Sequence, residues 1–200
     1  MDLLHDQLRP SRRIRGFTIW AVVTVLGTAL AGCSEDESGR EKNYSVPDSL
    51  CGVAVSPTLL EPFLPSGDQV SSKRTFPNGG TEECALIVDK KKVAIIAQQE
   101  WWNEKDDPLE KSTFYIRRKP HHVTEDNRYV YSGIGAVGKT KDCADATHPQ
   151  QRLFTIIQSF APDREDARTM KKLIKAYTKQ VEQSKACHPK PPKRPQPSAS

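Results

Sequence analysis

The sequence predicts an α+β domain, in which a single, mainly antiparallel sheet is packed by a short N-terminal helix and a long C-terminal helix and held by two disulfides. Three observations support this class. Short runs of β-branched and aromatic residues fill the middle of the chain, apolar residues at helical spacing lie on either side of them, and cysteines are spread from Cys51 to Cys187. Strands grouped in this way between helices form one covered sheet rather than an alternating α/β fold.

The first predicted element is a short helix that begins after Ser56. Ser56-Pro57 places a capping residue before a proline at the first helical position. Pro65 and Gly67 end the helix. Its apolar face consists of Leu59, Leu60, Phe63 and Leu64.

Strands are predicted in the middle of the chain. Ala85–Val88 and Val93–Gln98 flank a polar, lysine-rich run, which favours a hairpin. Phe114–Arg117 and Arg128–Tyr131 also have the composition of strands. Arg152–Phe160 is apolar enough to be buried on both faces, so we expect it to be the central strand.

The last predicted element is a long helix that follows Pro162. Asp163, Glu165 and Asp166 place negative charge at its start, where the helix dipole favours it. Apolar residues at helical spacing form one stripe along it, and lysines lie outside that stripe. The stripe consists of Ala167, Met170, Leu173, Ile174, Tyr177 and Val181, and the lysines are Lys171, Lys172, Lys175 and Lys179.

The N-terminus has the three zones of a secretory signal. Arg9–Arg15 is basic, Phe17–Leu30 has no charged residue, and small residues precede Cys33. The uncharged stretch is shorter than the roughly 20 apolar residues that span a bilayer. An ordinary signal peptide with a chance cysteine, or an uncleaved anchor, is the alternative. Ser11-Arg12-Arg13 also resembles a twin-arginine signal, so general secretory and twin-arginine export both stay open.

Leu30-Ala31-Gly32-Cys33 resembles a lipobox, the motif of bacterial lipoprotein signals. The resemblance implies that the Cys33 thiol receives a diacylglycerol and that cleavage leaves Cys33 as the new N-terminus. Two acyl chains suffice for stable attachment, because each buried CH₂ contributes ~0.8 kcal/mol. We therefore expect the mature chain to be lipid-anchored on the outer face of the cytoplasmic membrane.

Four parts of the chain are expected. Residues 1–32 form the lipoprotein signal peptide, residues 33–49 the lipidated cysteine and a flexible, acidic tether, residues 50–187 the extracytoplasmic domain, and residues 188–200 a disordered, proline-rich basic tail. With 36% hydrophobic and 28% charged residues, the mature chain can form one globular domain but not two.

The cysteines that follow Cys33 are Cys51, Cys84, Cys143 and Cys187. An even number in an exported chain indicates disulfides. Three pairings can be drawn, and we favour Cys51–Cys84 with Cys143–Cys187, because each bond would then tie one half of the domain. Cys-x-x-Cys spacing does not occur, which argues against a zinc site.

Net charge gives no indication of a nucleic-acid partner. The chain carries 30 Lys+Arg against 25 Asp+Glu, a net charge of +5. Removing residues 1–32 takes away four arginines and two aspartates and leaves +3, of which Lys190, Lys193 and Arg194 lie in the tail. The domain is therefore close to neutral and lacks the concentrated basic face that nucleic-acid binding requires.

Gly133–Thr140 matches the spacing of a phosphate-binding loop, and its first part matches the dinucleotide glycine pattern. Both motifs need a strand before and a helix after the glycines. Tyr129–Tyr131 can supply the strand, but the segment after Thr140 has no apolar helical stripe. We therefore expect no nucleotide here and interpret the segment as a glycine-rich strand against which another element packs closely.

Metal-binding and catalytic patterns are weak. His121-His122, with His148, Glu125 and Asp126, lacks helical His-x-x-x-His spacing, and adjacent histidines on a strand point to opposite faces. Gly-x-Ser-x-Gly is absent, and Ser132 has no histidine and acid partners that the sequence can identify. We expect no metal, no cofactor and no catalytic residue.

Trp101-Trp102 is the strongest candidate for a binding surface. On an extended strand one ring faces the core while its neighbour faces outward. An exposed tryptophan can anchor a partner or a ligand, although the second ring can instead cover the edge of a helix.

From Leu50 to Cys187 the chain resembles actinobacterial cell-envelope lipoproteins with a small, sensor-like α+β domain. The resemblance is carried by Leu30–Cys33 and by the placement of the other cysteines: Cys51 before the Leu-rich helix, Cys84 at a hairpin, Cys143 before the central strand and Cys187 after the last helix. Domains of this kind are non-enzymatic, and some similar ones form the outer sensor parts of membrane kinases.

The function expected from this resemblance is a non-catalytic binding or sensing module for an envelope molecule or partner protein. Two alternatives stay open. One is an accessory envelope lipoprotein whose tail contacts an anionic polymer, although the tail has fewer than the four to eight basic residues typical of lipid recognition. The other is an envelope hydrolase with a site assembled in space.

Overall fold

The structure is a computed structural model, which describes residues 42–116, 121–144, 149–161 and 163–187. These residues belong to one compact unit. The predicted signal peptide, Cys33 and the tail from residue 188 lie outside the described residues.

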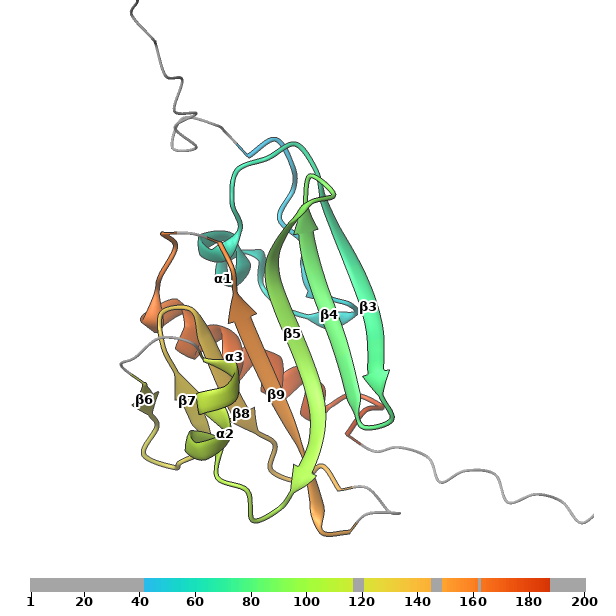
Figure 1. The fold of residues 1–200 in the computed structure, drawn as a ribbon, viewed down its shortest axis with the longest axis vertical. Helices are drawn as coiled ribbons and strands as arrows, with labels where there is room; N and C mark the ends of the chain where they lie inside the picture. Colours follow the sequence, from blue (N-terminus) through green and yellow to red (C-terminus); the bar gives the residue numbers. More distant parts are fainter. Residues whose placement is uncertain (1–41, 117–120, 145–148, 162, 188–200) are drawn as a thin grey trace, which may run out of the picture. The chain divides into compact units, whose positions relative to one another are not determined.

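A seven-stranded sheet forms the centre of this unit, with the strand order β3-β4-β5-β9-β8-β7-β6 (Figure 1). Each neighbouring pair is antiparallel. The strands are β3 (Val70–Asn78), β4 (Thr81–Val88), β5 (Lys92–Asn103), β6 (His122–Val123), β7 (Tyr129–Tyr131), β8 (Gly135–Lys139) and β9 (Gln151–Ser159). The predicted α+β class with a mainly antiparallel sheet is confirmed.

The remaining elements are short except for one helix. A two-stranded hairpin joins β1 (Ser49–Leu50) to β2 (Val53–Ala54). The helices are α1 (Pro57–Leu60), which continues into the 3-10 turn η2 (Glu61–Phe63), α2 (Pro108–Tyr115) and α3 (Ala167–Glu182).

Helices lie on both faces of the sheet, and each face has its own core. Successive residues of β9 illustrate this, because Leu153 packs with the cluster that contains the apolar stripe of α3, whereas Phe154 packs with Trp102 and with Ile116 after α2. Figure 1 shows α2 and α3 on opposite sides of the sheet. The strand β9 is buried on both faces, as its apolar sequence predicted.

The C-terminal helix begins later than Pro162. The side chain of Asp166 caps it, since one carboxylate oxygen accepts from the backbone N–H of Thr169 at 2.9 Å and the other from the Thr169 hydroxyl at 2.6 Å. These hydrogen bonds lower the pKa of Asp166. The predicted apolar residues from Met170 to Val181 are buried along one side of α3.

The prediction of a strand at Phe114–Arg117 is wrong, because Phe114 and Tyr115 end the helix α2. The cause is a cap that precedes this segment: the Asp107 carboxylate accepts from the N–H of Leu109 at 2.9 Å, and Pro108 takes the first helical position. Arg117 lies outside the described residues.

The predicted tether is shorter than expected at its C-terminal end. The backbone N–H of Asn43 donates to the carbonyl oxygen of Gly67 at 2.8 Å, and the Lys42 ammonium donates to the carbonyl oxygen of Glu61 at 2.7 Å. Tyr44 and Val46 pack against the core. The packing of Tyr44 and Val46 and the hydrogen bonds of Lys42 and Asn43 hold this segment on the domain, which therefore begins before Leu50.

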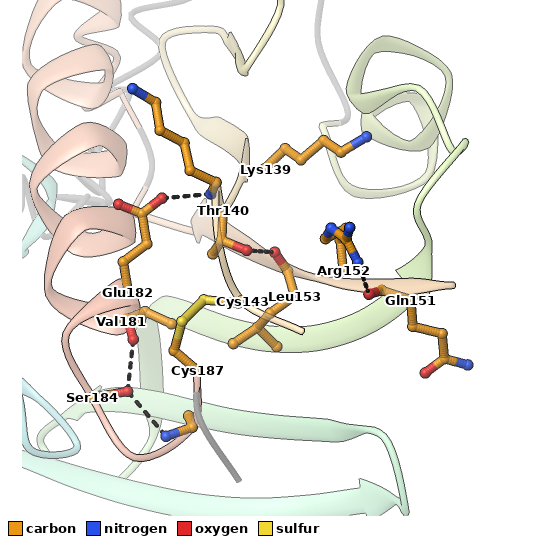
Figure 2. Close-up of a disulfide and its surroundings, with 12 residues drawn as sticks. Lys139, Thr140, Cys143, Gln151, Arg152, Leu153, Val181, Glu182, Ser184 and Cys187 are labelled. Carbon is orange, nitrogen blue, oxygen red and sulfur yellow. Dashed lines mark hydrogen bonds between the residues drawn. A yellow bond between two sulfur atoms is a disulfide. The ribbon is translucent and has the colours of Figure 1, made fainter. Parts of the chain in front are cut away.

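Both favoured disulfide pairings are confirmed. Cys51–Cys84 links the β1–β2 turn to β4. Cys143–Cys187 links the segment after β8 to the chain that follows α3 (Figure 2). Near this second bond, the Glu182 carboxylate accepts from the Lys141 N–H at 2.8 Å and from Arg128 at 2.6 Å. The end of α3 is thus joined to the sheet by a covalent bond and by charge-assisted hydrogen bonds.

Candidate functional site

The Gly133–Thr140 segment contains a strand, as expected. Residues 135–139 form β8, and no helix follows them before residue 145. A Cβ atom added at Gly138 would lie 2.5 Å from the Thr178 hydroxyl of α3. Gly138 therefore serves close packing of a helix on a strand rather than the approach of a phosphate.

His121 and His122 contact a hydroxyl group and an aromatic ring in the described part of the chain. The Nδ1 of His121 lies 3.3 Å from the Ser112 hydroxyl, and the ring of His122 stacks on Tyr131 at 5.2 Å. His148 lies outside the described residues. Among the residues that the structure describes, no group of three or more His, Cys, Asp or Glu is placed to hold a metal ion.

The two tryptophans lie on opposite faces of the sheet, as alternation predicted, but neither ring projects freely into solvent. Trp102 is only 7% exposed, because it packs between Tyr115 and Phe154 at centroid distances of 5.6 and 4.4 Å. Trp102 is therefore buried, and Trp101 is the ring of the predicted pair that stays partly exposed. The helix α2 explains the difference, since it covers the face on which Trp102 lies.

Trp101 is partly buried at the margin of the α3-side core and lines a cavity of about 230 Å³. The β3–β4 turn and Ala186, in the segment that follows α3, also line this cavity. Cross-strand pairs on the α3 side of the sheet form its floor, with Glu82 opposite Gln99 and Trp101 opposite Leu153. Phe76 also lines the cavity and is 67% exposed.

A buried polar network adjoins the cavity. The Gln99 amide donates to the Tyr177 hydroxyl at 3.4 Å, while its Oε1 is buried without a hydrogen-bond partner among the described residues. Burial raises the pKa of Tyr177, so its hydroxyl stays protonated. Burying an amide oxygen without a partner costs about 1–3 kcal/mol, so Gln99 is a polar residue buried at an energetic cost beside the cavity.

Charged groups are few among the described residues that line this cavity. Glu82 is the sole acidic or basic side chain among its described lining residues, and Arg74 pairs with it at 3.1 Å. Pockets that enclose a whole small-molecule ligand measure about 300–1,000 Å³. At about 230 Å³, this cavity instead fits one anchoring group of a larger molecule, which would contact the rings of Trp101 and Phe76.

A second, wider hollow of about 500 Å³ lies between the start of α2 and the β6–β7 turn. Its acids already have local partners. Asp107 caps α2, Asp106 pairs with Lys111 at 3.2 Å, and Asp126 accepts from the Thr124 hydroxyl at 2.5 Å. That last hydrogen bond lowers the pKa of Asp126. The Trp101 cavity is the stronger candidate, because it leaves a buried polar atom unsatisfied.

Comparison with protein-family models, curated proteins and solved structures gives no match for this chain. In the described part of the chain, none of the helices has the length and apolar character needed to cross a membrane.

Several residues of the cavity were missed by sequence reasoning. Gln99 could have been found, because it alternates with Ala97 and Trp101 on one face of a strand, where a polar residue is unusual. Pro77-Asn78-Gly79-Gly80 is a turn signal that could have indicated the β3–β4 hairpin. No pattern in the sequence around Ala186 indicates that this residue lines the cavity.

Proposed function

We propose that this protein is an exported lipoprotein that acts as a non-catalytic binding module for an envelope molecule or partner protein. In this proposal, cleavage precedes Cys33, and a diacylglycerol on Cys33 holds the mature chain on the outer face of the cytoplasmic membrane. The cavity beside Trp101 carries the binding part of the proposal and is its contact site.

The disulfides support an extracytoplasmic location for the domain. Structural disulfides form and persist in oxidising compartments and are rare in the cytosol. Here each bond joins segments far apart in the sequence, with separations of 33 and 44 residues. Together with the signal-like zones and the Leu30–Cys33 motif, they support export across the membrane.

The size and composition of the cavity support recognition of a larger molecule. A half-open site with a partly buried tryptophan, an exposed phenylalanine and an unsatisfied amide matches the aromatic anchors and few polar groups found at binding hot spots. Its single carboxylate, on Glu82, is already paired with Arg74 at 3.1 Å.

The lipid anchor is tested by intact-mass measurement of the protein purified from the membranes of cells that produce it. We expect a chain that begins at Cys33 and carries the added mass of a diacylglycerol. The Cys33→Ser variant, which offers a hydroxyl in place of the thiol, is expected to lack that mass. A cleaved chain without lipid that still fractionates with membranes would contradict the anchor.

The binding site is tested by native mass spectrometry of the same gently purified protein. We expect a non-covalent added mass on the wild type that is lost in Trp101→Ala, because removing the ring opens the cavity and deletes its largest apolar contact. Phe114→Ala is the matched control, since Phe114 is 75% exposed on α2, on the other face of the sheet.

Equal loss of the added mass in the Trp101→Ala and Phe114→Ala variants would contradict a site at this cavity. So would an added mass that survives Trp101→Ala at the wild-type occupancy. Thermal unfolding of both variants, measured in parallel, separates loss of binding from loss of folding.

A further inference from the structure

The outward side of α3 carries a continuous row of positive charge. Arg168, Lys172, Lys175 and Lys179 are all exposed, and their spacing of four, three and four residues places them on one face of the helix. At 1.5 Å per residue the row extends over about 16 Å. This face is opposite the apolar stripe that packs on the sheet.

An acid lies near the first residue of the row, since the charge of Arg168 contributes to lowering the pKa of the Asp166 carboxyl group after the hydrogen bonds from Thr169. In the described part of the chain no ion pair involves the four residues, and the acid nearest the C-terminal end of the row, Glu182, already binds Arg128 and the Lys141 N–H. The ammonium of Lys175 lies over the ring of Tyr129 at 5.8 Å, and that of the adjacent Lys171 over Tyr131 at 5.6 Å. These contacts place one cation of the row, Lys175, and one cation beside the row, Lys171, over aromatic rings of β7.

The N-terminal end of the domain lies close to the start of this helix. Lys42 donates to the carbonyl of Glu61 in η2, which directly follows α1, and α1 contacts α3. Burial lowers the pKa of Lys42, and the positive charge of nearby Arg164 lowers it further. Arg164 lies three residues before the start of α3, so the chain enters the domain near the first cation of the row.

Chain length limits how far this end can lie from a lipid on Cys33. Residues 34–41 separate Cys33 from Lys42, and even a fully extended chain of this length reaches at most about 30 Å. An anchored domain is therefore kept at high effective concentration beside the membrane surface, which in the proposed location is the nearest extended anionic surface.

From these observations we infer that the cationic row of α3 is a docking surface for anionic phospholipid headgroups, which holds the domain against the membrane that anchors it. The inference rests on the proposed lipid anchor for the choice of occupant. Four basic residues reach the lower limit of the clusters that bind anionic lipid surfaces, whereas the three cations of the C-terminal tail do not.

The test uses the unlipidated mature chain, residues 34–200, with its disulfides formed. Binding is measured by co-sedimentation with vesicles of phosphatidylcholine alone and with vesicles of equal parts phosphatidylglycerol and phosphatidylcholine. We expect binding to the anionic vesicles only, and loss of that binding near 1 M salt, where the Debye length falls to about 3 Å.

A fourfold variant, Arg168→Gln, Lys172→Gln, Lys175→Gln and Lys179→Gln, is expected to bind the anionic vesicles at least about 100-fold more weakly. Each basic residue near such a surface contributes about fivefold. The matched control neutralises four exposed lysines elsewhere and is expected to stay within a few-fold of the wild type. These lysines are Lys73, Lys90, Lys91 and Lys105.

Equal loss of binding in the two fourfold variants would overturn the inference, because net charge alone would then explain the attraction. Binding to a soluble polyglycerol phosphate without binding to anionic vesicles would also overturn it and would make an envelope polymer the occupant. The vesicle result does not depend on lipidation. A chain that lacks lipid on Cys33 therefore ends the anchor proposal, whereas failure of vesicle binding by residues 34–200 ends only this inference.

Discussion

Replacing Cys143 and Cys187 together by alanine is expected to lower the free energy of unfolding by about 4 kcal/mol. The bond closes a loop with a sequence separation of 44 residues, and cross-linking a loop of this size removes that much chain entropy from the unfolded state. Both cysteines are at most 1% exposed, so the disulfide lies in the interior of the folded protein. The end of α3 would then depend on Glu182 and local packing alone.

The change is measured by thermal unfolding followed by circular dichroism. For a domain of this size, a loss of about 4 kcal/mol corresponds to a fall in Tm of roughly 10–15 °C. The wild type in reductant is the control and is expected to melt lower still, since it also loses Cys51–Cys84. A fall of less than about 3 °C in the double variant would show that the bond contributes little to the folded state.

Gly138→Ala is expected to destabilise the domain by about 2–4 kcal/mol, even though it adds only one methyl group. The new carbon would lie 2.5 Å from the Thr178 hydroxyl and 2.8 Å from the Thr155 hydroxyl. These two hydroxyls form a buried hydrogen bond of 2.6 Å between α3 and β9. Overpacking of about 1–3 kcal/mol adds to the cost of leaving buried hydroxyls unpaired.

Denaturant unfolding measures this loss, and Gly79→Ala is the matched control. A Cβ atom at Gly79 meets nothing within 4 Å, so we expect a change within about 0.5 kcal/mol there. If Gly138→Ala is as stable as Gly79→Ala, close packing is not the reason that a glycine occupies position 138.

The elements that the sequence predicted correctly have strong apolar patterns. The stripe of α3 and the apolar run of β9 are both buried as expected, because the burial that stabilises these elements is also what gives them their pattern. The strand β3 was missed because most of its residues are exposed. It is held at the edge of the sheet by backbone hydrogen bonds to β4, which leave no pattern in the side chains.

The candidate site was predictable only in part. Alternation placed Trp101 and Trp102 on opposite faces, but it could not tell which ring a helix would cover, because α2 has a weak apolar pattern and buries Pro108 and Ser112. The cavity depends on Phe76 and Ala186 meeting around Trp101. Strand register and the position of the end of α3 bring these residues together, and neither can be obtained from local sequence.

The two disulfides also determine how the domain would respond to tension on its ends. A pull on the N-terminal end can peel away Lys42–Leu50 by breaking a few hydrogen bonds, but it then reaches Cys51, which is bonded to β4 inside the sheet. A pull on the C-terminal end reaches Cys187 and passes to Cys143 before α3 can unwind. The segments enclosed by Cys51–Cys84 and Cys143–Cys187, which include α1, β3 and α3, are thus shielded from the force, whereas the chain between Cys84 and Cys143 carries it.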